Sequence, residues 1–212
     1  MNNKRTFTPP DVIREYRKLY VIAVEGDKTE PSYFQHISGE LDAVDTRLRI
    51  IPPESKSAPQ HVLKNIQDYL ESPSPNGASE CWMVIDRDQW TVETLDNVVK
   101  TCQESKIGLC VSNPAFEFWL LLHFEKGEGI QPAETATPRN SSVKACKERI
   151  RNNQYLPEFG KILRDNHWII LRSKTKDAIQ HAKELDSSLH EDYPKGRIGS
   201  TVYKLIEKLV TG

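Results

Sequence analysis

The stretch VIAVEGDKTEPSYF, residues 21–34, starts as a buried strand and then places three carboxylates around one glycine and one lysine. The run Leu19–Val24 is short, rich in β-branched residues and followed closely by Gly26, which is typical of a strand buried in a sheet. Thr29–Pro31 then favours the first turn of a helix, because proline suits that position. The carboxylates therefore follow the end of a strand, where an open parallel sheet gathers its functional groups.

Strands and helices alternate along the chain up to about residue 125. The sequence predicts strands at 48–51, 81–86 and 106–112, a loop at 72–77, and helices at 59–70, 91–105 and 113–125, the last opened by Pro114 and apolar nearly all round. This alternation predicts parallel βαβ units with right-handed crossovers. We therefore expect an α/β fold in which helices sandwich a Rossmann-like parallel sheet.

The second part of the chain has a different pattern. A link rich in Gly, Pro and Thr at 126–140 leads into mostly helical sequence, with helices predicted at 175–189 and at 200–210, where Ser200 is the expected N-cap. The segment 167–173 is compatible with either a strand or a buried helix. We therefore expect a catalytic core at 1–125 and a basic, mostly helical extension at 126–212, packed on the core as one unit.

Composition limits the class of protein. With 212 residues, of which 37% are hydrophobic, the chain can bury the core of one domain with one appendage. The net charge of −1 gives no bulk basicity, yet nine Lys or Arg against three Asp or Glu lie between Lys144 and Lys176. This segment either attracts phosphates or, as is commoner for such runs, forms a solvated helical surface.

Cysteine usage and hydropathy bear on the setting of the protein. The four cysteines show neither C-x-x-C spacing nor histidines at zinc spacing, so neither a zinc site nor a redox pair is predicted. Residues 1–18 lack the apolar centre of a signal peptide, and no run approaches the ~18 apolar residues of a membrane span. We therefore expect a cytoplasmic protein without membrane contact.

Four carboxylates follow the predicted strands. Glu25 follows the first strand, Asp86 and Asp88 end the third, and Glu117 lies just inside the helix after the fourth. We expect them to converge on one edge of the sheet, with both aspartates pointing the same way if strand geometry persists to Asp88. Such a cluster repels itself at neutral pH, and Mg²⁺ would relieve the repulsion. Taken alone, an Asp-x-Asp is commonly a surface turn or a helix cap.

The order of these motifs separates competing folds. A haloacid-dehalogenase-type phosphotransferase would carry Asp-x-Asp after its first strand, and the P-loop pattern G-x-x-x-x-G-K-[ST] is absent. A glutamate after the first strand with Asp-x-Asp after the third is similar to the Toprim arrangement.

Three motifs carry a resemblance to one family. VIAVEGDKTEPSYF, WMVIDRDQW (82–90) and SNPAFEFWLLLHF (112–124) together resemble the RloB family, Toprim-like proteins of bacterial anti-phage defence that are also similar to the PARIS nuclease subunit. GRIGST at 196–201 departs from the family's usual Asn-Pro-Ser-Thr.

The resemblance implies roles for particular residues. It makes Glu25 a metal ligand and general acid/base, and Asp86 and Asp88 ligands of Mg²⁺, for which Mn²⁺ can substitute. Glu117 either completes the acidic site or is a buried helix-start acid paired to a cation. Lys28 either neutralises a phosphate or is a surface lysine that pairs with Glu30; we count it as substrate-binding.

The remaining assignments concern cations and aromatic side chains. His123 lies on an apolar helix and is more often a core histidine than a catalytic group. Trp90 either stacks on a base or covers an edge of the core. The cations of the basic segment that we expect to bind substrate are Lys144, Lys147, Arg151, Lys161 and Arg164.

Our first hypothesis is a Mg²⁺-dependent Toprim-type endonuclease that cleaves RNA, tRNA included, or DNA as the effector of an anti-phage system. The chain has no ATP-binding loop, so the resemblance implies an ATPase partner of the RloA or PARIS type encoded nearby; homo-oligomerisation is left open. The second hypothesis is a non-catalytic module that binds nucleic acid or the ATPase, and a third is a phosphohydrolase of small nucleotides. The presence of Glu25, Asp86 and Asp88 together favours an enzyme.

Overall fold

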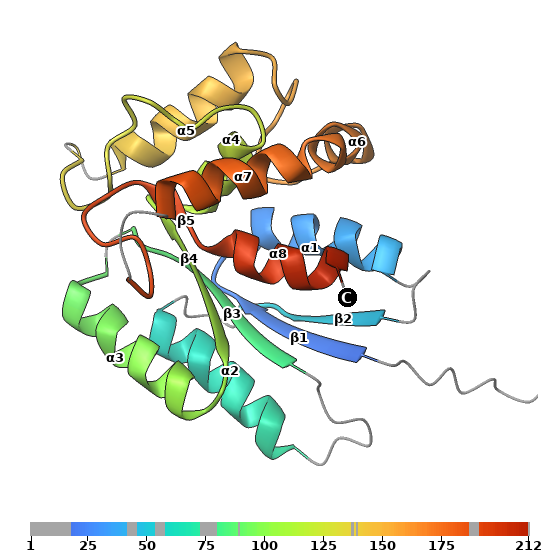
Figure 1. The fold of residues 1–212 in the computed structure, drawn as a ribbon, viewed down its shortest axis with the longest axis vertical. Helices are drawn as coiled ribbons and strands as arrows, with labels where there is room; N and C mark the ends of the chain where they lie inside the picture. Colours follow the sequence, from blue (N-terminus) through green and yellow to red (C-terminus); the bar gives the residue numbers. More distant parts are fainter. Residues whose placement is uncertain are drawn as a thin grey trace, which may run out of the picture.

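The computed structural model describes residues 18–41, 46–53, 58–72, 80–88, 90–136, 138, 140–186 and 191–211; apart from Ser72, the loop predicted at 72–77 lies outside them. An α/β sandwich is built on one five-stranded sheet in the order β2-β1-β3-β4-β5 (Figure 1). Its strands are β1 (Lys18–Val24), β2 (Thr46–Ile51), β3 (Glu80–Asp86), β4 (Gly108–Asn113) and β5 (Gly199–Ser200). The first four strands run parallel, which confirms the predicted fold class.

Helices cover both faces of the sheet (Figure 1). They are α1 (Thr29–Leu41), α2 (Pro59–Glu71), α3 (Val92–Glu104), α4 (Phe116–Leu122), α5 (Ser141–Asn152), α6 (Asp165–Ser173), α7 (Thr175–Asp186) and α8 (Val202–Thr211). One face carries α2 and α3. The other carries α1, α4 and α8, with α5, α6 and α7 beyond them.

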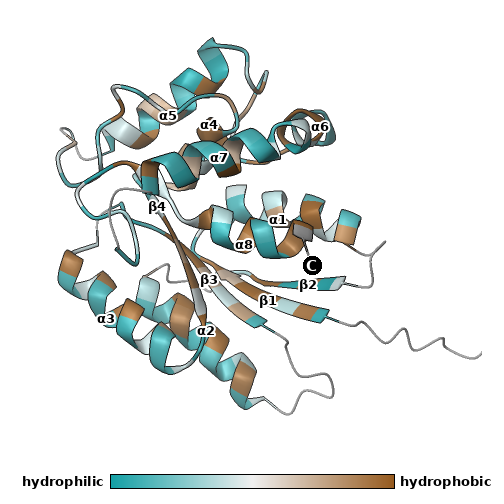
Figure 2. Cartoon of the chain, in the orientation of Figure 1, coloured by the Kyte–Doolittle hydropathy of each residue, from teal (hydrophilic) through white to brown (hydrophobic). Residues whose placement is uncertain are grey.

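The alternation of side chains in β1 explains the two cores. Tyr20, Ile22 and Val24 pack into the core under α1, α4 and α8, whereas Val21 and Ala23 pack into the core under α2 and α3. Both sides of the strand are buried, as its unbroken apolar run predicted. Figure 2 shows hydrophobic residues along β4 and at intervals on α2 and α3.

Some boundaries differ from the prediction. The helix expected to open at Pro114 begins at Phe116, because the backbone is still extended at Ala115; the bond between Asn113 and Pro114 is cis. Ser200 is not the N-cap of the last helix: it pairs with Ser112 in β5, and α8 starts at Val202. The segment left open between strand and helix lies in α6.

The C-terminal part contributes to the sheet itself. The short β5 pairs antiparallel with β4, so that a strand from the second half of the chain extends the sheet, and α8 packs on β4. The division at residue 125 stays a prediction. Among the helices that the structure describes, none is long and apolar enough to cross a membrane.

Candidate functional site

The loop between β1 and α1 brings Glu30 back over the end of its own strand. Glu30 is only 5% exposed, and its carboxylate lies against the backbone N–H groups of Gly26 and of Glu30 itself. A Cβ on Gly26 would collide with this carboxylate, so glycine is needed for the close approach. Burial, followed by the charges of Glu117 and Asp27, raises the pKa of Glu30 to about 7.

Glu25 is held by two hydrogen bonds. Its Oε2 accepts the backbone N–H of Asp86 at 2.9 Å, and its Oε1 accepts the indole N–H of Trp90 at 3.0 Å. Burial raises the pKa of Glu25 to about 7, against the effect of these two hydrogen bonds. Trp90 also packs against the core under α2 and α3, so it covers a core edge, one of the two expected roles, and orients Glu25.

The Asp-x-Asp motif turns sharply at the end of β3. Asp86 is the last residue of the strand, and its Oδ1 accepts the backbone N–H of Phe116, the first residue of α4, at 2.8 Å. Burial and the charges of Glu30 and Glu25 raise the pKa of Asp86 well above its ordinary value. Asp88 has a φ of +23°, so strand geometry does not persist to Asp88 as the shared orientation of the two aspartates required.

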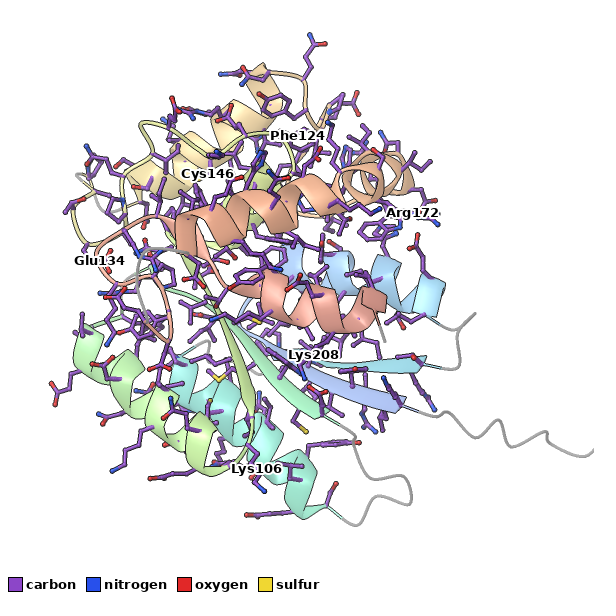
Figure 3. All side chains as sticks on the ribbon, viewed as in Figure 1. Lys106, Phe124, Glu134, Cys146, Arg172 and Lys208 are labelled. Atoms are coloured by element: carbon purple, nitrogen blue, oxygen red, sulfur yellow. The ribbon has the colours of Figure 1, made fainter. Side chains whose placement is uncertain are left out.

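Arg87, between the two aspartates, anchors this turn. It is 4% exposed and forms an ion pair of 2.7 Å with Glu134. Glu134 also accepts hydrogen bonds from the side-chain amide of Asn113 and from the backbone of Gly196. Figure 3 labels Glu134 at the left edge of the view. The ion pair therefore links the end of β3 to two loops of the second half of the chain.

Glu117 meets a cation from the second half of the chain. It lies in the first turn of α4, and its side chain, 8% exposed, pairs with Lys147 of α5 at 3.1 Å. Its charge also raises the pKa values of Glu30 and Asp86. Glu117 is therefore a buried helix-start acid with a cationic partner, and it also lies beside the other carboxylates; its catalytic role stays a prediction.

A cavity of about 470 Å³ lies at the carboxyl ends of the strands and is lined by Glu30, Asp86 and Glu117 among others. Its lining includes an acidic group, defined as Glu30, Asp86, Asp88 and Glu117, and a basic group, defined as Lys144, Lys147, Arg151 and Lys161. The acidic group comes from α1, the end of β3 and α4, whereas the basic group comes from α5 and the segment after it. The cavity thus combines carboxylates that can hold a cation with cations that can hold a phosphate.

The segment between α5 and α6 is attached to the start of α1. The Thr29 hydroxyl donates to the carbonyl of Lys161 at 2.9 Å, and the backbone N–H of Leu163 donates to the Ser32 hydroxyl at 3.1 Å. Arg151 in turn donates from Nε to the carbonyl of Phe159 at 2.7 Å. These contacts hold Lys161 and Arg151 at the cavity.

Other predicted site residues lie elsewhere or in a different setting. The Glu25 side chain does not line the cavity. It accepts a hydrogen bond from the backbone N–H of Asp86, which does line the cavity. Lys28 lines the cavity, and no ion pair joins it to Glu30 among the described residues, whereas Arg164 is outside the lining and pairs with Glu158. His123 is fully buried, as expected of a core histidine, and burial lowers its pKa to about 4.

The acidic group suits a hard divalent cation in its chemistry. Its ligands are all carboxylate oxygens, and a bound cation would relieve the repulsion that, together with burial, raises the pKa values of Glu30 and Asp86. Within the described residues, no three His, Cys, Asp or Glu side chains stand ready as a metal-binding group. Mg²⁺ is commonly held by one or two carboxylates, with water and substrate phosphate completing its shell, so the group fits this mode of binding.

Two residues that shape the candidate site, Glu30 and Arg87, were not predicted. The sequence places Glu30 next to a helix-start proline and offers it only as a partner of Lys28; the glycine four residues earlier signals the close approach. Arg87 lies inside the Asp-x-Asp motif, where strand alternation would turn it away from its neighbours, but its partner Glu134 lies in a link without regular pattern.

Comparison with known proteins gives one result. The family model described as "RloB-like protein" matches residues 20–209, which is most of the chain and includes the strand ends, the cavity and α5. Neither the curated proteins nor the solved structures contain a match.

Proposed function

The chain belongs to the RloB-like family, and from this premise we propose that it is a Mg²⁺-dependent nuclease that cleaves phosphodiester bonds in RNA or DNA. The observation that carries the proposal is the cavity itself, where the acidic group and the basic group lie together. A metal-dependent phosphodiesterase uses both kinds of charge, because cations hold the phosphate oxygens while carboxylates hold the metal and accept a proton.

Metal binding, phosphate binding and the orientation of Glu25 would fall to different residues of the chain. Asp86 and Asp88 would hold Mg²⁺, which supplies charge neutralisation at the phosphate and lowers the pKa of a bound water. The basic group would hold the phosphates on either side of the bond. Trp90 keeps Glu25 in one orientation through its indole N–H at 3.0 Å.

Two carboxyls are suited to the proton transfer. The resemblance assigns general acid/base catalysis to Glu25, and Glu30 lines the cavity with a pKa of the same value, about 7. A group with a pKa near the working pH exchanges protons most effectively in both directions. The variants E25Q and E30Q separate the two carboxyls. Only the substitution of the carboxyl that transfers the proton should abolish the dependence of cleavage on pH near neutrality.

The biological setting is proposed from the family resemblance. The protein would act as the effector of an anti-phage system, with an ATPase subunit of the RloA or PARIS type as its partner. This partner would supply the regulation by ATP for which the chain has no P-loop.

The test is a cleavage assay of the full chain, alone and with the ATPase encoded beside it, on tRNA, single-stranded DNA and duplex DNA with Mg²⁺ or Mn²⁺. We expect cleavage that EDTA stops and that D86N abolishes. Binding of nucleic acid or of the ATPase without cleavage under any of these conditions would replace the nuclease by a non-catalytic binding module. Cleavage of small nucleotides only would indicate a phosphohydrolase.

A further inference from the structure

Lys147 differs from the other cations of the cavity by its position. Its Nζ lies 3.1 Å from Oε1 of Glu117, and the two side chains are 25% and 8% exposed. Lys144, one turn earlier on the same helix, is 76% exposed and pairs with Glu148 of its own helix at 3.6 Å. One lysine of α5 therefore contacts the acidic group at Glu117, whereas its neighbour Lys144 stays in solvent.

The carboxylates around Lys147 repel one another. Burial raises the pKa values of Glu30 and Asp86, and the charges of Glu117 and of further carboxylates raise both pKa values more. A single positive charge at Glu117 lowers the free energy of this cluster, since the attraction between opposite charges is strong where water is partly excluded. The ammonium of Lys147 thus does part of what a divalent cation would do.

We propose that Lys147 holds the place of the divalent cation, pairing with Glu117 while no metal is bound and leaving it for a substrate phosphate once the metal binds. The inference rests on the proposed metal site. A monovalent and a divalent cation within a few ångströms repel each other, so metal binding weakens the ion pair between Lys147 and Glu117.

The lysine side chain is suited to such an exchange. Its four-carbon stem is flexible and carries a compact charge, so the ammonium can move without a change of the helix. Lys147 lines the same cavity as Lys144 and Arg151, and a released ammonium therefore remains beside the other phosphate-binding cations. Metal and polyanion then bind cooperatively, because the metal releases a cation for the phosphate.

The experiment measures metal affinity without activity. Binding of Mn²⁺ to the full chain is titrated at pH 8 through the electron paramagnetic resonance signal of free Mn²⁺, for wild type, K147Q, K147R and K144Q. We expect K147Q to bind Mn²⁺ about tenfold more tightly than wild type, because no ion pair has to be broken first. K147R keeps a cation at Glu117 and should bind as wild type does, and K144Q should stay within about twofold of it.

The outcomes separate this inference from the proposed function. Equal affinity of wild type and K147Q, or weaker binding by K147Q, overturns the placeholder role and leaves the metal site intact. Absence of Mn²⁺ binding in every variant overturns the metal site and the placeholder role with it. If K147Q does not fold, K147M, which keeps the length of the side chain without its charge, is titrated in its place, and the same outcomes apply.

Discussion

The acidic group and the basic group line the same cavity but are held in place by different means. Glu30 and Glu117 are 5% and 6% exposed as residues, and Asp86 is tied to the backbone of α4. The basic group sits on a helix surface and on a connecting segment, and Lys144 is 76% exposed. Burial and backbone hydrogen bonds therefore fix the carboxylates, whereas the most exposed cation, Lys144, keeps the freedom to follow a substrate. Substitutions should accordingly have large effects in the acidic group and small, graded effects in the basic group.

The largest effect is expected for D86N. Asparagine keeps an oxygen that accepts the N–H of Phe116, but it removes a charge from the crowded carboxylates. Cleavage should fall by roughly a hundredfold or more, whereas the melting temperature without metal should not fall. Activity assays and thermal melting in EDTA measure both.

The control for D86N is D68N on α2, an exposed aspartate on the opposite face of the sheet, which should change neither quantity. If D86N unfolds the protein, the Asp86 carboxylate is structural. If it cleaves as wild type does, the acidic group is not the active site.

A second test concerns the pH dependence of stability. Because the pKa of Glu30 is raised from 4.5 to about 7 in the folded protein, the folded state binds more protons than the unfolded state between these values. The free energy of unfolding contributed by this group therefore falls as pH rises from about 4.5 to about 7. E30Q should remove this loss and be more stable than wild type at pH 8 by about 1–3 kcal/mol, but not at pH 4.5.

Urea unfolding in EDTA at the two pH values measures the difference. His123, whose pKa is lowered to about 4, acts in the opposite direction, since its stabilising contribution is lost as pH falls from 6.5 towards 4. It is present in both proteins and cancels in the comparison. E104Q, at an exposed glutamate of α3, serves as the control. An equal difference in the free energy of unfolding between E30Q and wild type at both pH values would show that folding does not raise the pKa of Glu30.

Part of the site could be predicted from the sequence, namely the meeting of Glu25 with Asp86 at the ends of two parallel strands. Alternating apolar runs locate the ends of β1 and β3, and parallel topology then brings Glu25 and Asp86 together without any knowledge of side-chain contacts. The contact between Glu117 and Lys147 could not be predicted, because it joins residues 30 positions apart across an irregular link. Sequence likewise does not tell which cations of a helical surface face a cavity: Arg151 does, and Arg164 does not.

A smaller effect should separate two glycines. A methyl group on Gly26 would collide with the Glu30 carboxylate, which is the movable end of its side chain, so G26A should displace Glu30 from the cavity at a small cost in stability. Gly39 lies in α1 with no atom near its missing side chain, and G39A should stabilise the protein by about 0.5–1 kcal/mol. Chemical denaturation compares the two, and equal effects would mean that Glu30 does not lie against Gly26.

The smallest effects are expected in the basic group, where each cation contributes one exposed phosphate contact. K144Q and K161Q should each reduce the slope of log affinity against log salt by about 0.7–0.9, which changes affinity by only roughly threefold between 50 and 200 mM salt. R164Q should leave the slope unchanged, because Arg164 pairs with Glu158 outside the cavity. Filter-binding titrations of single-stranded and duplex nucleic acid at several salt concentrations test all three. A reduced slope for R164Q together with unchanged slopes for K144Q and K161Q would place the nucleic acid on α6, and the cations of the cavity would then serve a purpose other than phosphate binding.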